Sequence, residues 1–164
     1  MDLTAADYGS AAKTKGLIMI KVFEITEMSQ KVYDAFERLI PQLSSSAKIP
    51  TWDELSDLIS SKAGIVLAAV DDEDPEEKIL GTMTLVIFRI PTGLRAWVED
   101  VVVDGAERGK GIGEKLIRAA INRAKSEGCR TVDLTSNPKR EAAHRLYKRC
   151  GFEIRETCVF RLIP

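Results

Sequence analysis

Apolar residues recur along this chain at two spacings, one typical of β-strands and one typical of α-helices. Apolar side chains three and four residues apart predict helices at 32–43, 112–124 and 142–147. Short runs rich in Val, Ile and Leu predict six strands, at residues 18–25, 64–70, 79–88, 95–103, 131–135 and 153–163.

Residues with special roles at helix ends set further boundaries. Thr51 and Glu54 have the spacing of a capping box, so another helix should begin directly after Thr51. Gly128 should end the helix that precedes it, while Pro138 should start the last helix and Gly151 should end it.

The elements follow the order β-α-α-β-β-β-α-β-α-β, without an internal repeat or a linker. We therefore expect an α/β (α+β) fold in one domain, residues 18–164, with a mixed, mostly antiparallel sheet flanked by helices. Residues 1–17 are small and polar, and we expect a disordered extension or a remnant of expression.

Composition narrows the class of protein. The chain is 45% hydrophobic and 30% charged, as in globular proteins, and its net charge of −1 favours neither nucleic acid nor membrane as a partner. Three scattered cysteines and one histidine suggest neither disulfides nor a metal site, so we expect a reduced, cytoplasmic compartment and no metal. The apolar run at 79–88 is too short for a membrane helix, and no signal peptide is recognisable.

A glycine-rich loop joins the strand at 95–103 to the next helix. Its backbone N–H groups, continued by those of the helix start, can bind a phosphate, although the glycines could also simply form a tight turn. The spacing does not fit a nucleoside triphosphate loop, and it fits a dinucleotide loop only loosely, with Asp133 as the ribose-binding acid. Coenzyme A is the remaining phosphate carrier. The loop reads Arg108, Gly109, Lys110, Gly111, Ile112 and Gly113.

Two motifs carry a family resemblance. The loop matches [QR]-x-x-G-x-[GA], and residues 143–152 match A-x-x-L-Y-x-x-x-G-F. Together, in this order and on this topology, they resemble the GNAT superfamily of acyl-CoA-dependent N-acyltransferases. The resemblance implies an enzyme that uses acetyl-CoA as cosubstrate. It also implies main-chain contacts from Val101, Val102 and Val103 to the pantetheine arm, and N–H contacts from the loop to the pyrophosphate.

The sequence departs from the family at one position. Many members carry Asn seven residues before the motif tyrosine, near the pantetheine arm, whereas this chain has Arg140. Asn137 is close by, and we expect it to act as a substitute in coenzyme binding.

The resemblance also assigns chemistry. It implies that the hydroxyl of Tyr147 acts as the general acid at the coenzyme sulfur. The base that deprotonates the amine could be Glu99, Asp100 or a water chain, and we favour Glu99; strands of the family usually carry a bulge here. We expect His144 to be a surface residue. Cys150 has no neighbouring base, so we expect direct transfer without an acyl-enzyme.

The acceptor is not identified by the sequence. We expect residues 41–50 to form one wall of its site, and the candidates are a small amine, an amino sugar phosphate, an amino acid or a protein amine. The run Glu99-Asp100-Val101-Val102-Val103 looks like that of glucosamine-phosphate acetyltransferases. A non-catalytic acyl-CoA-binding module is the main alternative, and a dinucleotide-dependent oxidoreductase is less favoured. GNAT proteins are often dimers, which leaves a homodimer open.

Overall fold

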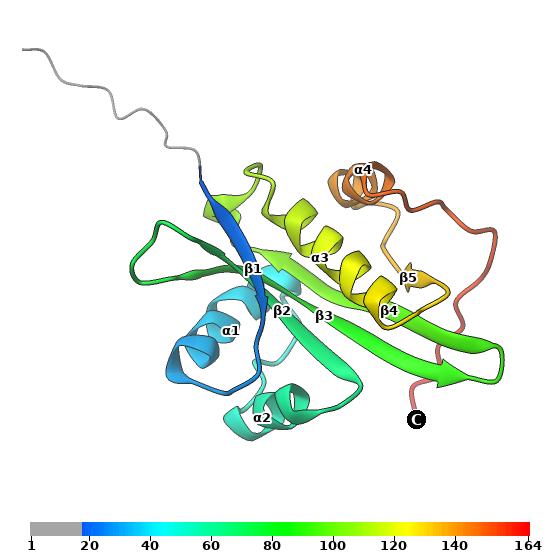
Figure 1. Cartoon of the computed structure of the whole chain (residues 1–164), viewed down its shortest axis with the longest axis horizontal. Helices are drawn as coiled ribbons and strands as arrows, with labels where there is room; N and C mark the ends of the chain where they lie inside the picture. Colours follow the sequence, from blue (N-terminus) through cyan, green and yellow to red (C-terminus); the bar gives the residue numbers. More distant parts are fainter. Residues whose placement is uncertain (1–17) are drawn as a thin grey trace, which may run out of the picture.

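A five-stranded sheet in the order β1-β2-β3-β4-β5 forms the centre of the protein (Figure 1). The computed structural model describes residues 18–164, so the expected extension at 1–17 lies outside the described residues. All neighbouring strands are antiparallel except β4 and β5, which are parallel. The elements are β1 Ile20–Glu24, α1 Gln30–Leu43, α2 Trp52–Ser60, β2 Gly64–Asp71, β3 Ile79–Ile90, β4 Gly93–Val103, the short 3₁₀ helix η1 Gly105–Glu107, α3 Ile112–Ser126, β5 Val132–Leu134 and α4 Glu141–Arg149.

Local chemistry explains where the first two helices begin. The Ser29 hydroxyl accepts a hydrogen bond from the Val32 N–H at the start of α1. At α2, Thr51 and Glu54 form the expected reciprocal capping box, with distances of 2.7 and 3.2 Å. The capping prediction is therefore confirmed.

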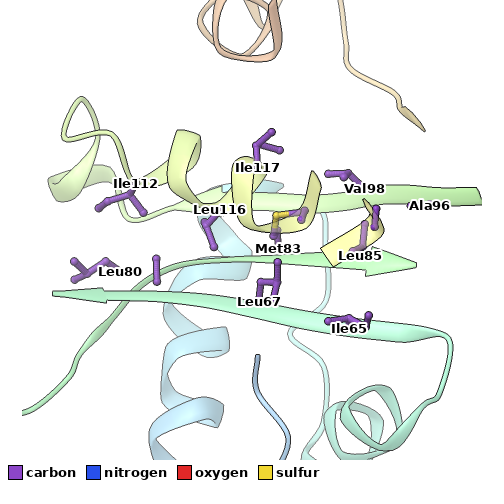
Figure 2. Close-up of a cluster of buried hydrophobic side chains, with 13 residues drawn as sticks. Ile65, Leu67, Leu80, Met83, Leu85, Ala96, Val98, Ile112, Leu116 and Ile117 are labelled. Carbon is purple, nitrogen blue, oxygen red and sulfur yellow. The ribbon is translucent and has the colours of Figure 1, made fainter. Parts of the chain in front are cut away.

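Each face of the sheet is covered by helices, which gives two apolar clusters. On one face, α3 buries Ile112, Leu116 and Ile117 against strand residues such as Leu67 and Met83 (Figure 2). On the other face, α1 and α2 bury a second cluster that includes Phe36, Leu39 and Leu55. The expected mixed, mostly antiparallel sheet flanked by helices is confirmed.

Strand β4 carries an irregularity that shapes the site. Its pairing with β3 shifts between Thr82↔Val102 and Thr84↔Glu99, so Asp100 and Val101 lie opposite the single residue Met83. Asp100 has a positive φ of 51°. This is the expected β-bulge. At and beyond the bulge, β4 no longer pairs with β5, because the two strands pair only over Ala96–Val98 of β4.

The last part of the chain differs from expectation. Residues 153–163 form no strand and lie as an exposed irregular segment after α4, so the predicted sixth strand is wrong. Strand β5 has only three residues and offers a short edge for pairing. The last helix begins at Glu141 and not at Pro138, because the Asn137 side chain and carbonyl accept hydrogen bonds from Lys139 and Arg140 N–H and form a turn first.

Two further observations concern the described part of the chain. Cys129, Cys150 and Cys158 are all free thiols. No helix between residues 18 and 164 combines the length and apolar character that crossing a bilayer requires.

Candidate active site

The glycine-rich loop presents an uninterrupted row of free backbone N–H groups. Within residues 18–164, the N–H groups of residues 108–114 have no hydrogen-bond acceptor, and the first helical bond of α3 runs from Lys115 N–H to Gly111 O. Gly109 and Gly111 have φ values of 80° and 85°, which favour glycine. A Cβ atom at either position would meet no atom within 4 Å. The loop is therefore open on the side where an anion would bind.

Contacts around the loop hold it in place. Gln42 of α1 accepts a hydrogen bond from Gly105 N–H at 2.7 Å. Asp104, the buried last residue before the loop, forms an ion pair with Arg38 of α1. Burial alone would raise the pKa of Asp104, but the hydrogen bond from Ala106 N–H and the charge of Arg38 outweigh burial and lower it.

The basic side chains of the loop already have partners. Lys110 pairs with Glu107 at 2.5 Å, and Arg108 Nε donates to the Val103 carbonyl at 3.3 Å. The main-chain carbonyl of Val103, which we expect to contact the pantetheine arm, therefore already accepts a hydrogen bond from Arg108. The N–H groups of the loop are the more available anion ligands.

A pocket of about 470 Å³ lies beside the bulge of β4. Its walls come from α1, the α1–α2 connection, α2, β3, β4, β5, the β5–α4 connection and α4. The expected acceptor wall at 41–50 contributes Leu43, Ser44, Ala47, Lys48 and Pro50.

Tyr147 lines this pocket from α4. Its ring meets Phe152 edge-on, with centroids 6.0 Å apart, and packs against the α3-side core. No partner for its hydroxyl is found within residues 18–164. Burial raises the pKa of this phenol, with a smaller opposing effect from the Arg140 charge, so Tyr147 is a proton donor at neutral pH. Its neighbour Leu146 lies close to Gly113 at the start of α3, where an added Cβ atom would be 3.2 Å from Leu146 Cδ2.

Glu99, directly before the bulge, and Asp100, within it, line the same pocket. The indole N–H of Trp97 donates to a Glu99 carboxylate oxygen at 2.7 Å. Trp97 therefore orients Glu99 and is not among the residues that line the pocket. One carboxylate oxygen of Glu99 accepts the hydrogen bond from the indole N–H. The other oxygen has no bond to Trp97 and is therefore available to accept a proton as a general base.

The other predicted residues lie in several places. Val101 lines the pocket. Val102 is buried in the apolar cluster under α1 and α2, and Val103 is the last residue of β4. Asn137 lies outside this pocket, in a second hollow, and its side-chain oxygen accepts from Lys139 N–H. Ile112 is buried in the core and contributes its N–H only.

His144 and Cys150 stand apart from the pocket. His144 is half-buried, and its Nε2 is shielded from solvent without a hydrogen-bond partner within the described chain, so the expectation of a surface residue is wrong. Burial is the main cause that raises the pKa of the Cys150 thiol, so this sulfur stays protonated. Neither residue lines the pocket that Tyr147 and Glu99 share.

Some pocket residues had no signal in the sequence. Lys48 is in a connection without periodicity, and Ser136 follows a three-residue strand. Only the fold brings them to Tyr147. For Lys48, the sequence indicated no more than that residues 41–50, between two predicted helices, would form a wall of the acceptor site.

The arrangement of free loop amides, a diverging β4 edge and a pocket with a tyrosine can be compared with known proteins. Residues 19–152 match the model of the Acetyltransferase (GNAT) family. The chain belongs to the GNAT family of acetyltransferases. This acetyltransferase is therefore an acyltransferase enzyme, and members of its family use acetyl-CoA as cosubstrate.

Individual relatives agree with the family. A probable glucosamine 6-phosphate N-acetyltransferase 2 of Oryza sativa subsp. japonica is 32% identical over 151 residues, which cover 87% of this chain and 86% of that protein. An aminoglycoside acetyltransferase from a soil metagenome shares the fold with a TM-score of 0.76 at 21% identity, covering 89% of this chain and 96% of that one. The glucosamine-6-phosphate N-acetyltransferase of Arabidopsis thaliana has a TM-score of 0.70 at 22% identity, covering 89% and 99%.

Residues 18–164 contain no group of three or more His, Cys, Asp or Glu side chains that could hold a metal ion.

Proposed function

We propose that this acetyltransferase moves an acetyl group from acetyl-CoA directly to the primary amine of an amino sugar phosphate. The observation that carries the proposal is the row of unpaired N–H groups at 108–114, next to a pocket that contains both Tyr147 and Glu99. The rice relative, named for glucosamine 6-phosphate, supports the acceptor class.

Binding of the coenzyme would use the loop and the open edge of β4. The free N–H groups and the N-terminus of α3 suit the pyrophosphate. The edge of β4 beyond Val98 has no β5 partner and can hydrogen-bond the amides of the pantetheine arm. These groups direct the thioester toward Tyr147, whose neighbour Leu146 lies close to Gly113 at the start of α3.

Transfer then needs three proton movements. Glu99, directly or through water, accepts a proton from the acceptor ammonium, and the freed amine attacks the thioester carbonyl. A C–N bond forms as the C–S bond breaks. Tyr147 donates its proton to the departing sulfur, and its raised pKa keeps it protonated until then. The attacking nitrogen loses its second proton as the amide forms, and that proton returns the Tyr147 phenolate to its neutral form.

The acetyl group does not need to pass through the enzyme. Cys150 is outside the pocket, and its raised pKa keeps it a poor nucleophile. A cytoplasmic location stays a prediction.

The test follows release of the coenzyme thiol and formation of the N-acetyl product, with acetyl-CoA and a panel containing glucosamine 6-phosphate, glucosamine, an aminoglycoside, an amino acid and a peptide amine. Product should form fastest with glucosamine 6-phosphate, at a rate equal to thiol release. Thermal stabilisation by coenzyme A without transfer to any amine would instead indicate a non-catalytic binding module. Stabilisation by NAD and not by coenzyme A would overturn the proposal.

A further inference from the structure

The charged side chains of the pocket are divided by element. Its acids are Glu99 and Asp100 at the bulge of β4 and Glu54 of α2, whose carboxylate accepts a hydrogen bond from Thr51 N–H at the start of that helix. Its cations Lys48 and Arg140 come from the α1–α2 connection and the start of α4. An acceptor with an ammonium group and an anionic group would match both kinds of charge.

Arg140 connects two walls of the pocket. Its Nη2 donates to the carbonyl of Leu43, the last residue of α1, at 3.0 Å across 97 positions of sequence. That bond uses one of five N–H donors, so the guanidinium retains donors for a ligand. Within residues 18–164 no carboxylate lies within 4.0 Å of Arg140 or Lys48, whereas Arg145 on the same helix pairs with Glu141. Arg140 is therefore available to an anion. Lys48 lies near Glu54, whose pKa is lowered by hydrogen bonds from Thr51 and, to a smaller extent, by the charge of Lys48, so Lys48 is the less free of the two cations.

A second polar group beside Arg140 also has no partner. The hydroxyl oxygen of Ser136 is shielded from solvent, makes no hydrogen bond in the described chain, and belongs to a residue that lines the pocket. Arg140 and Ser136 also share the second hollow with Asn137 and Thr135. An unsatisfied buried hydroxyl is unfavourable, so Ser136 gains a hydrogen bond if its side chain turns toward an anion in the pocket.

We propose that Arg140 and Ser136, assisted by Lys48, bind the phosphate of the acceptor and so determine its specificity. This inference rests on the proposed function. A phosphate offers acceptor oxygens to the planar guanidinium and to a hydroxyl donor at once. With the phosphate held there, the pocket acids remain for the amine. Arg140 thus has a role toward the acceptor at the position where related sequences carry Asn.

The experiment compares kcat/KM for glucosamine 6-phosphate and for glucosamine in the wild-type protein, Arg140→Gln and Arg145→Gln. Wild type should prefer the phosphorylated amine. Arg140→Gln should lower kcat/KM for glucosamine 6-phosphate by about 10- to 100-fold, mainly through KM, and change the value for glucosamine by less than about threefold. Arg145→Gln removes the same charge from a solvent-facing position of α4 and should behave as wild type.

Three further measurements make the result decisive. Arg140→Lys should recover part of the phosphate preference, because it keeps the charge but not the planar geometry. Ser136→Ala should lower the preference too, and it tests the subsite if Arg140→Gln does not fold. Coenzyme A affinity, measured by calorimetry, should be unchanged in all variants.

The outcomes separate the two proposals. A wild-type protein that does not prefer the phosphorylated amine would contradict the proposed acceptor itself. A wild type that does prefer it, with Arg140→Gln and Ser136→Ala retaining the preference, would overturn only the subsite. An equal loss for both acceptors, or a loss of coenzyme A affinity, would assign Arg140 to the loop or the coenzyme and overturn it as well.

Discussion

At position 147, burial and a neighbouring charge act on one phenol in opposite directions. Burial raises the pKa of Tyr147 more than the Arg140 charge lowers it. Removing only the hydroxyl, in Tyr147→Phe, should reduce kcat by about 100-fold, because the leaving sulfur loses its proton donor. Coenzyme A affinity, measured by calorimetry, should change by less than about threefold, since the ring packing is kept.

A matched control and a pH profile accompany this variant. Tyr33→Phe removes a phenol that packs on Trp52 and does not line the pocket, so it should keep full activity. In the wild type, kcat should fall at alkaline pH as Tyr147 loses its proton, above the ordinary tyrosine pKa of 10.0. Full turnover in Tyr147→Phe would remove this residue from the mechanism.

The Arg38–Asp104 pair is a second site where a single residue has a measurable consequence. Asp104→Asn should lower the free energy of unfolding by about 2 kcal/mol at pH 7, because Arg38 and Ala106 N–H lose a charged acceptor in a buried place. The pKa of Asp104 is lower in the folded than in the unfolded protein. Its stabilisation is thus present above the ordinary value of 3.8 and is lost as pH falls through the folded pKa.

Urea unfolding at pH 7 and pH 3 checks this expectation. The difference between wild type and Asp104→Asn should shrink at the lower pH. Glu141→Gln, which breaks an exposed pair with Arg145, should stay within about 0.5 kcal/mol of wild type. A difference that does not depend on pH would contradict the electrostatic explanation.

Single residues were predictable from the sequence where a motif or local spacing identifies them. The loop glycines and Tyr147 belong to motifs, and Thr51 with Glu54 is a contact between near neighbours in sequence. The bond from Arg140 to the Leu43 carbonyl has no comparable signal, since it joins residues 97 positions apart. The hydrogen bond from Trp97 to Glu99 depends on side-chain rotamers, which a pattern of apolar positions does not contain.

At the scale of elements, a glycine in the left-handed conformation lies at each end of α3. The same substitution can therefore be tested at the glycine-rich loop and at a position far from the proposed coenzyme site. Gly111 and Gly128 have φ values of 85° and 78°, and a Cβ at either would meet no atom within 4 Å. Replacing either by Ala should lower the free energy of unfolding by about 1 kcal/mol, because the left-handed conformation is strained for Ala. Only Gly111→Ala should also weaken coenzyme A binding, by about tenfold, since relief of that strain turns the loop N–H groups.

Gly128→Ala is therefore the control for Gly111→Ala. Thermal or urea unfolding gives the stability of each variant, and calorimetry with coenzyme A gives the affinity. Equal affinities in the two variants would show that the N–H groups at the start of α3 do not bind the coenzyme.

Elements were predictable where apolar spacing and capping act over short distances. The helices and the first five strands follow this rule, whereas the bulge of β4 was expected from the family resemblance. The start of α4 was misplaced because Asn137 forms a turn that competes with helix initiation at Pro138. The last strand was wrong because an apolar run becomes a strand only beside an edge that can pair with it.

At the scale of the whole molecule, residues 153–164 leave large apolar side chains in solvent. Phe160 is 94% exposed and Leu162 is 87% exposed. The segment lies close to β5, since Arg155 reaches Asp133 at 3.6 Å, yet it forms no backbone pairing with that strand within residues 18–164. The contacts of this segment within its own chain therefore leave these apolar side chains exposed. Burial of such a surface against another protein is favourable.

A second copy of the chain is the partner that a purified sample always contains. We expect the mass measured by light scattering to rise from monomer to dimer with concentration. The double variant Phe160→Ser/Leu162→Ser should shift this transition to at least tenfold higher concentration, because about 1.4 kcal/mol of lost apolar burial suffices for that change. Phe88→Ser alters a side chain that is only 36% exposed, on β3, and should leave the transition in place. A wild-type mass that stays monomeric at every concentration would show that this segment covers no partner copy.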